Sequence, residues 1–173
     1  GFVSPFEGKI AGGEMDIERS TNAHIAEYSP DSTRLAYVSG SNPGAVVTND
    51  VLKVRDLRTG AERSIYAEPG LSSPSWSPDG QQIAFVRYNK PRGVWAISYV
   101  NADGTKIDGQ PIKTIVDTAL GGEFRGGVSW SGLNMIAFAM NTTGGSDIYT
   151  TFPDGKIVRN VTNHPADDST PVW

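Results

Sequence analysis

The chain has 173 residues and a formal net charge of −4, with two histidines and no cysteine. The acidic balance excludes a basic stripe that could bind nucleic acid, and the lack of cysteine excludes disulfides and thiolate metal sites. No apolar run reaches the roughly 20 residues that span a bilayer, so we expect no membrane insertion. Twenty glycines and eleven prolines favour short strands joined by tight turns. The composition therefore predicts one all-β domain over residues 1–173.

The first recognisable element begins at Tyr28, and its pattern returns twice along the chain. The three copies read Tyr-Ser-Pro-Asp-Ser at 28–32 with an apolar run at 35–38, Trp-Ser-Pro-Asp-Gly at 76–80 with Ile-Ala-Phe-Val at 83–86, and Trp-Ser-Gly at 130–132 with Ile-Ala-Phe-Ala at 136–139. Asp-Gly favours positive φ, so each copy predicts two strands joined by a two-residue hairpin turn, one residue shorter in the third copy. The spacing of the copies is close to the roughly 40 to 50 residues of a four-stranded propeller blade.

Each copy continues with two more predicted strands. The pairs cover residues 51–57 and 62–66, then 94–99 and 112–116, then 147–150 and 156–161. Each unit is thus a four-stranded antiparallel meander, and we expect blades at about 23–68, 72–117 and 126–163. Residues 169–173 match the first strand of a further blade, and residues 3–11 keep the offset of the 76–84 copy. Residues 1–22 and 164–173 would then form a composite blade.

The Trp-Ser-Pro-Asp-Gly phrase, the following Ile-Ala-Phe, the aromatic third strand and the Asp-Gly turn resemble the TolB-like β-propeller repeat. Residues 76–86 carry the best match, and the resemblance covers nearly all of the chain. It implies a β-propeller of three full blades plus the composite blade. Three arrangements stay open: a small closed ring, an arc completed by oligomerisation, and an arc completed by missing sequence.

The sequence offers no catalytic constellation. It has no Gly-x-Ser-x-Gly segment for a nucleophilic serine, and we interpret the glycines at 121–122 and 126–127 as a turn between two blades. We expect structural roles for the turn aspartates and for the tryptophans, Trp95 among them, that is, for Asp31, Asp79, Asp103, Asp154, Trp76, Trp95, Trp130 and Trp173. Asp167 and Asp168 near His164 are interpreted as a solvated loop. We therefore predict no catalytic residue, no metal and no cofactor.

A propeller binds its ligands where the loops between blades converge at the mouth of the central channel. The connections read from the repeat offer polar side chains of mixed sign, Glu68 and Ser72 among them. The predicted ligand-binding residues are His24, Ser73, Glu123, Arg125, His164, Asp167 and Asp168. This mixture suits a protein or peptide ligand.

The favoured function is a non-enzymatic protein- or peptide-binding module. By resemblance to TolB-like propellers, it would lie in the periplasm or at the cell surface of a bacterium, with a homo-oligomer as one way to complete the ring. The alternative is the substrate-gating propeller of a prolyl-oligopeptidase-like or tricorn-like peptidase, whose hydrolase domain would lie outside these residues. A second alternative is a carbohydrate-processing enzyme on a propeller scaffold.

Overall fold

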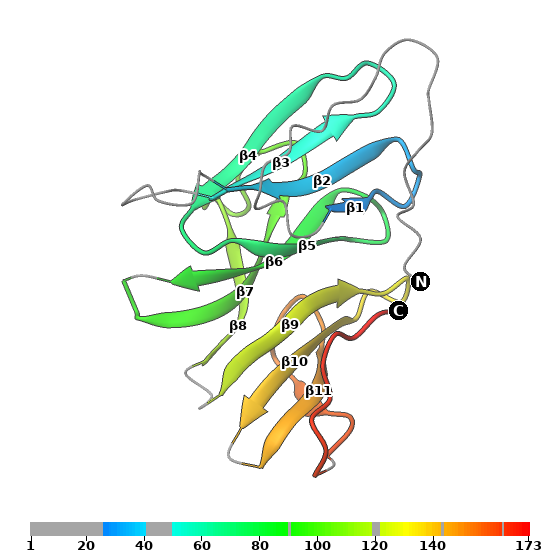
Figure 1. Cartoon of the computed structure of the whole chain (residues 1–173). Helices are drawn as coiled ribbons and strands as arrows, with labels where there is room; N and C mark the ends of the chain where they lie inside the picture. Colours follow the sequence, from blue (N-terminus) through cyan, green and yellow to red (C-terminus); the bar gives the residue numbers. More distant parts are fainter. Residues whose placement is uncertain (1–25, 41–49, 90, 119–121, 143, 164) are drawn as a thin grey trace.

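The structure, a computed structural model, describes residues 26–40, 50–89, 91–118, 122–142, 144–163 and 165–173. Within these residues the chain forms three four-stranded antiparallel sheets and no helix that could cross a membrane (Figure 1). The strands of each sheet follow one another in sequence order. The predicted all-β class and the four-stranded meanders are confirmed.

The strand bounds follow the repeat. The first sheet contains β1 (Ala26–Tyr28), β2 (Arg34–Ser39), β3 (Asp50–Asp56) and β4 (Glu62–Glu68). The second contains β5 (Ser72–Trp76), β6 (Gln82–Asn89), β7 (Val94–Asn101) and β8 (Lys113–Asp117). The third contains β9 (Glu123–Trp130), β10 (Ile136–Thr142), β11 (Gly145–Thr151) and β12 (Val158–Asn160). We call these sheets blades 1, 2 and 3.

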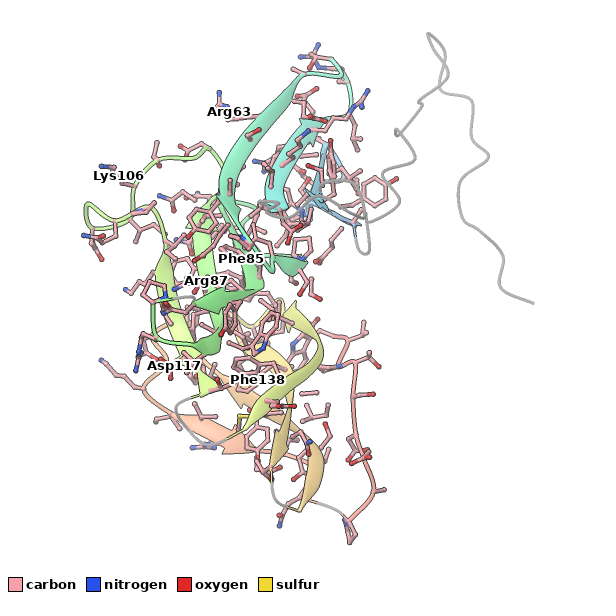
Figure 2. The ribbon with its side chains drawn as sticks, turned by 60° about the vertical axis from the view of Figure 1, so that its left-hand side comes forward. Arg63, Phe85, Arg87, Lys106, Asp117 and Phe138 are labelled. Carbon is pink, nitrogen blue, oxygen red and sulfur yellow. The ribbon has the colours of Figure 1, made fainter. Side chains whose placement is uncertain are left out.

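The second strand of a blade shows why the blades stack. In β6, Ile83 and Phe85 join a core that includes Leu52 of blade 1, because alternate side chains of a strand point to opposite faces. Ala84 of the same strand joins a second core, which includes Phe138 of blade 3 (Figure 2). Both faces of blade 2 are therefore buried, and the blades are held together by apolar contact between their faces.

The turn between the first two strands is longer than predicted. The amide of Ser77 donates to the carbonyl of Gln82 at 2.9 Å, which leaves four residues, 78–81, in the loop instead of two. Gly80 takes the expected positive φ of 67°. In blade 3 the corresponding loop is one residue shorter, as predicted, because Ser131 pairs with Met135. The prediction of a two-residue turn was wrong because the hydrogen bond that closes the loop is made by the serine before it. In each blade the hydroxyl of that serine also accepts a hydrogen bond from a backbone amide after the loop.

The turn aspartates have the structural role expected of them. Each accepts a hydrogen bond from the backbone amide two residues further on, at 2.9 to 3.1 Å, in the pairs Asp31–Thr33, Asp79–Gln81, Asp103–Thr105 and Asp154–Lys156. Hydrogen bonds from the Ser29 hydroxyl and then from the amide and hydroxyl of Thr33 favour the charged carboxylate and lower the pKa of Asp31 to about 2. The recurrence of aspartate in the sequence thus reflects turn geometry.

The tryptophans divide into two groups. Trp76 and Trp130 are buried between blades, as predicted. Trp95 was expected to be packed, but 39% of it is exposed, and it contacts the ring of Tyr88 edge-on. It lies at the start of β7, beside Gly70.

Closure of the ring stays a prediction. Residues 1–22, the larger part of the predicted composite blade, lie outside the described residues. Residues 169–173 form no strand, although the indole of Trp173 donates to the carbonyl of Ser129 in β9 at 3.1 Å. The C-terminal segment therefore lies beside β9, at the place where the first strand of a further blade would lie.

Candidate functional site

A cavity of about 320 Å³ lies where the inner strands of the blades converge, and we call it the axial cavity. Its walls come from four inner segments, which contribute residues at matching positions of the repeat. The lining residues are Ala26 and Glu27 of β1, Ser73–Pro74–Ser75 of β5, Gly127–Val128–Ser129 of β9, and Thr170–Pro171–Val172 near the C-terminus. The cavity thus follows the axis of the propeller arc, and most of its wall is apolar.

Strained backbone shapes this cavity. Ser73 has a φ of 53° and Thr170 a φ of 55°, and each precedes a proline at the same repeat position. The left-handed conformation is unfavourable for residues other than glycine. Such residues keep it where the surrounding structure imposes it, as at ligand sites. The pairing between β5 and β6 also shifts register between Ser72 and Ser75. The inner strands are therefore distorted where they face the cavity.

Among the described residues that line the cavity, Glu27 alone has an ionisable side chain. Burial raises the pKa of its carboxyl group above the usual value, while hydrogen bonds from the Ser75 hydroxyl and the Trp76 amide act in the opposite direction. These two bonds and the indole of Trp76, which donates to the Glu27 carbonyl at 2.9 Å, fix the position of Glu27. The cavity therefore contains one half-buried, well-positioned acid.

The walls are tied to each other across the blades. The backbone amide of Trp130 donates to the hydroxyl of Ser75 at 3.0 Å, and Ser75 in turn bonds to Glu27. Ser75 thus links the inner strands of all three blades. Such side-chain bonds replace the backbone pairing that neighbouring blades do not make, and they give the cavity a preformed shape.

The structure places the predicted site residues in different surroundings. Ser73 lines the axial cavity, whereas Glu123 is exposed at the start of β9 and Arg125 lies in β9 opposite Ala139. His24 and His164 lie outside the described residues. Gly126 and Gly127, expected in a connection between blades, instead form an irregularity within β9.

Asp167 and Asp168 hold the C-terminal segment against blade 3. The Ser146 amide donates to Asp167 Oδ1 at 2.9 Å, and the Ser146 hydroxyl donates to the Asp168 carbonyl at 2.9 Å. The described residues contain no group of three or more side chains that could hold a metal ion. The observed contacts of these aspartates are therefore those of a loop attached to β11.

Glu68 is not available at the mouth of the channel. Its carboxylate pairs with Arg87 of blade 2 at 2.9 Å, and the Tyr66 hydroxyl donates to it at 2.8 Å. Burial, followed by the bond to Glu68, raises the pKa of Tyr66 to about 12. Arg87 is a buried residue of β6 that also donates a hydrogen bond to the Ser98 hydroxyl of β7 (Figure 2). The network joins blades 1 and 2.

A second hollow, of about 400 Å³, lies at the outer edge of blades 2 and 3. It is lined by Thr114–Asp117 of β8 and by Gly155, Lys156 and Val158. Although it is larger, only two neighbouring segments form it, and its largely buried acid, Asp117, is already paired with Arg92. The axial cavity, with four converging segments and Glu27, is the better candidate site.

The sequence contained one signal for Glu27 that the repeat analysis missed. Glu27 stands directly before the tryptophan position, where the later copies have Ser75, Ser129 and Val172. The first copy thus carries a carboxylate at a position where the other copies carry a small or apolar side chain, and packing does not require an acid there. All four residues at this position line the axial cavity.

Comparison with known proteins agrees with the geometry. No family model matches the chain. The Tol-Pal system protein TolB of Anaeromyxobacter dehalogenans (strain 2CP-C) is 28% identical over 144 residues, which cover 82% of this chain. The chain spans about 30% of the length of that curated relative.

Solved structures share the fold. The crystal structure of TolB from Acinetobacter baumannii superposes with a TM-score of 0.61 at 21% identity, covering 79% of this chain and 31% of that one. A puromycin-hydrolysing peptidase of Mycobacterium tuberculosis gives a TM-score of 0.59 at 19% identity, covering 80% of this chain and 23% of that one. The repeat, the three stacked sheets and these likenesses agree: the chain has a TolB-like β-propeller fold.

Proposed function

We propose that the chain is a non-enzymatic protein- or peptide-binding propeller module, and that the axial cavity is where it receives its ligand. The observation that carries this proposal is the convergence of four inner segments on one preformed, largely apolar cavity. Sites of this kind, with a few positioned polar groups in an apolar wall, are typical of ligand binding.

The size of the cavity supports a peptide segment as the ligand. A volume of about 320 Å³ is at the lower end of ligand pockets, so it suits one or two side chains of a larger partner. Proline and valine side chains in the wall, Pro74, Val128 and Pro171 among them, offer apolar contact. The hydroxyls of Ser73 and Ser129 lie in the same wall and can accept or donate bonds to a peptide backbone.

Resemblance supports the compartment. The curated relative is by name a component of the Tol-Pal system. We therefore place the chain in the bacterial periplasm or at the cell surface, with a protein of the cell envelope as the partner.

A cavity-filling variant tests the proposal. Random dodecapeptides displayed on phage would be selected on the immobilised protein, and the affinity of the selected peptides would be measured by calorimetry. Ala26→Trp places a large ring in the cavity wall at an exposed position, and we expect it to abolish binding. Leu133→Trp, at an exposed turn outside the cavity, is the matched control and should leave affinity unchanged. Peptides that bind both variants equally would contradict the proposal.

A peptidase-gating propeller is the alternative, because peptidase structures share the fold. It differs from the main proposal in needing a hydrolase domain in the same protein. A hydrolase domain encoded beside this propeller in its gene would favour the alternative. Binding of a folded envelope protein by the propeller alone would favour the main proposal.

Association of copies is one way to complete the ring. Trp173 is 56% exposed, although its bond to Ser129 repeats the bond that the buried Trp76 makes to Glu27. We propose that a second copy covers this indole. Light scattering across a range of concentrations should then show a dimer that Trp173→Ser weakens and Leu133→Ser does not, and a monomer at all concentrations would contradict this proposal.

A further inference from the structure

The axial cavity combines an apolar wall with one acid, and that combination selects a ligand chemistry. Glu27 takes part in none of the ion pairs found among the described residues. Its carboxylate has two donors, the Ser75 hydroxyl and the Trp76 amide, and both are neutral. A carboxylate in apolar surroundings without a cation is costly, and a cationic partner would offset that cost.

We propose that the axial cavity takes a basic side chain, of arginine or lysine, from its peptide partner, and that Glu27 pairs with the charged group. This inference rests on the proposed function and names its ligand class. The geometry fits because arginine and lysine have long aliphatic stems and charged heads. The stem would lie along Pro74, Val128 and Pro171, and the head would reach Glu27 in β1.

Other described features favour a basic side chain over a neutral one. Ser73 and Ser129 lie in the same wall, and a serine hydroxyl can accept a hydrogen bond from a guanidinium or ammonium group. None of the described residues that line the cavity is basic. Arg34, in the neighbouring strand, is held over the ring of Trp76 at 4.7 Å and bonded to the Gly80 carbonyl.

Burial supports the same conclusion. The raised pKa of Glu27 shows that burial opposes its charge more strongly than its two hydrogen bonds favour it. An acid kept in such a place without an ionic partner in the described residues has the character of a ligand-binding group. Charge-assisted bonds from a guanidinium or ammonium group are roughly twice as strong as neutral ones.

The experiment uses the selected dodecapeptides. We expect them to share an arginine or lysine, and replacing that arginine by citrulline, its neutral analogue, should weaken binding by about tenfold or more, as loss of a charge-assisted bond does. Glu27→Gln, which keeps the shape and the hydrogen-bonding carbonyl, should weaken binding of the parent peptide equally. It should not weaken binding of the citrulline peptide any further. Glu123→Gln, an exposed acid outside the cavity, is the control.

The outcomes separate this inference from the proposed function. If Ala26→Trp abolishes binding while Glu27→Gln leaves it unchanged, the cavity binds peptides and the basic-residue inference is wrong. Selected peptides without a shared basic residue would overturn it as well. If Ala26→Trp has no effect on the selected peptides, the proposed function itself fails. Circular dichroism of each variant, unchanged from the parent, confirms that folding is intact.

Discussion

The indole nitrogen of Trp76 donates a hydrogen bond to the backbone carbonyl of Glu27 at 2.9 Å, and this bond ties the inner strand of blade 2 to that of blade 1. Trp173 makes the same bond to Ser129, one blade further on, at 3.1 Å. The two indoles differ in burial, since Trp76 is 2% exposed and Trp173 is 56% exposed. The bond therefore recurs with the repeat, and we expect its contribution to stability to depend on how deeply the indole is buried.

Trp76→Phe should lower the free energy of unfolding by about 1 kcal/mol or more, because it leaves the partly buried Glu27 carbonyl without its donor and removes buried ring atoms. Trp173→Phe removes the same bond at an exposed site, where water replaces the donor, and should change stability by less than about 0.5 kcal/mol. Urea unfolding followed by circular dichroism measures both. Equal losses in the two variants would show that burial does not govern the bond.

The blades could be predicted from the sequence because their signal is local and repeated. The turn aspartates and the alternation of Ile83, Ala84 and Phe85 depend only on neighbouring residues and strand geometry. The exposure of Trp95 and the bond between Glu68 and Arg87 depend on how one blade meets the next. The residue pattern within one repeat does not show which side chains of neighbouring blades meet.

The pair formed by Arg87 and Glu68 is a second link between blades. Arg87→Met should destabilise the protein by about 3 kcal/mol or more, since it leaves the mostly buried Glu68 without its cation. The double variant Arg87→Met/Glu68→Met should lose less than the sum of the two single variants, because neither charge is then stranded. A double-mutant cycle from urea unfolding gives the coupling.

An additive result in that cycle would mean that the pair is not coupled. A matched exposed pair is available for comparison in Lys53 and Glu62, which are 2.8 Å apart and partly solvated. Its coupling should be below about 1 kcal/mol, as for other surface pairs.

Two glycines with similar backbone conformation distinguish the cost of a left-handed backbone from the cost of a steric clash. Gly104 has a φ of 76° and no atom within 4 Å of the place where a Cβ would stand, whereas at Gly155, with a φ of 67°, that Cβ would collide with the backbone carbonyl of Ile115. Gly104→Ala should therefore cost about 1 kcal/mol, from the left-handed conformation alone. Gly155→Ala should cost several times more and loosen the contact between blades 2 and 3. Thermal unfolding of both variants tests this difference. Similar losses of stability would contradict the close contact between Gly155 and Ile115.

The candidate site was only partly predictable. Ser73 was expected at the channel mouth because the repeat locates the connections between blades. The structure places it in β5, in the wall of the axial cavity, and its part in binding stays a prediction. Glu27 was missed because its role depends on three strands meeting at the axis, from blades separated by about 50 residues in sequence. The positive φ of Ser73 and Thr170 was also unforeseen, since neither residue type favours it.

Acid should destabilise the folded protein through its turn aspartates. Hydrogen bonds from turn residues lower the pKa values of four carboxyl groups, those of Asp31, Asp56, Asp79 and Asp103. In the unfolded chain these groups take up protons at higher pH than in the folded one, so their contribution is present above pH 3.8 and is lost as the pH falls towards about 2. Asp79→Asn should make the fall in stability over this window shallower. An unchanged slope would show that the turn bonds do not survive in solution.

Glu27 should act with the opposite sign. Its pKa in the folded protein lies above the usual 4.5, so the folded state holds the proton more tightly than the unfolded state, and the charged carboxylate opposes folding once the pH rises through that range. Glu27→Gln removes this penalty and should stabilise the protein at neutral pH, with the difference from the parent shrinking below pH 4.5. Urea midpoints of the two proteins across this range test the sign. A variant that is more stable but binds basic peptides more weakly would show that Glu27 is retained for its ligand at the expense of stability.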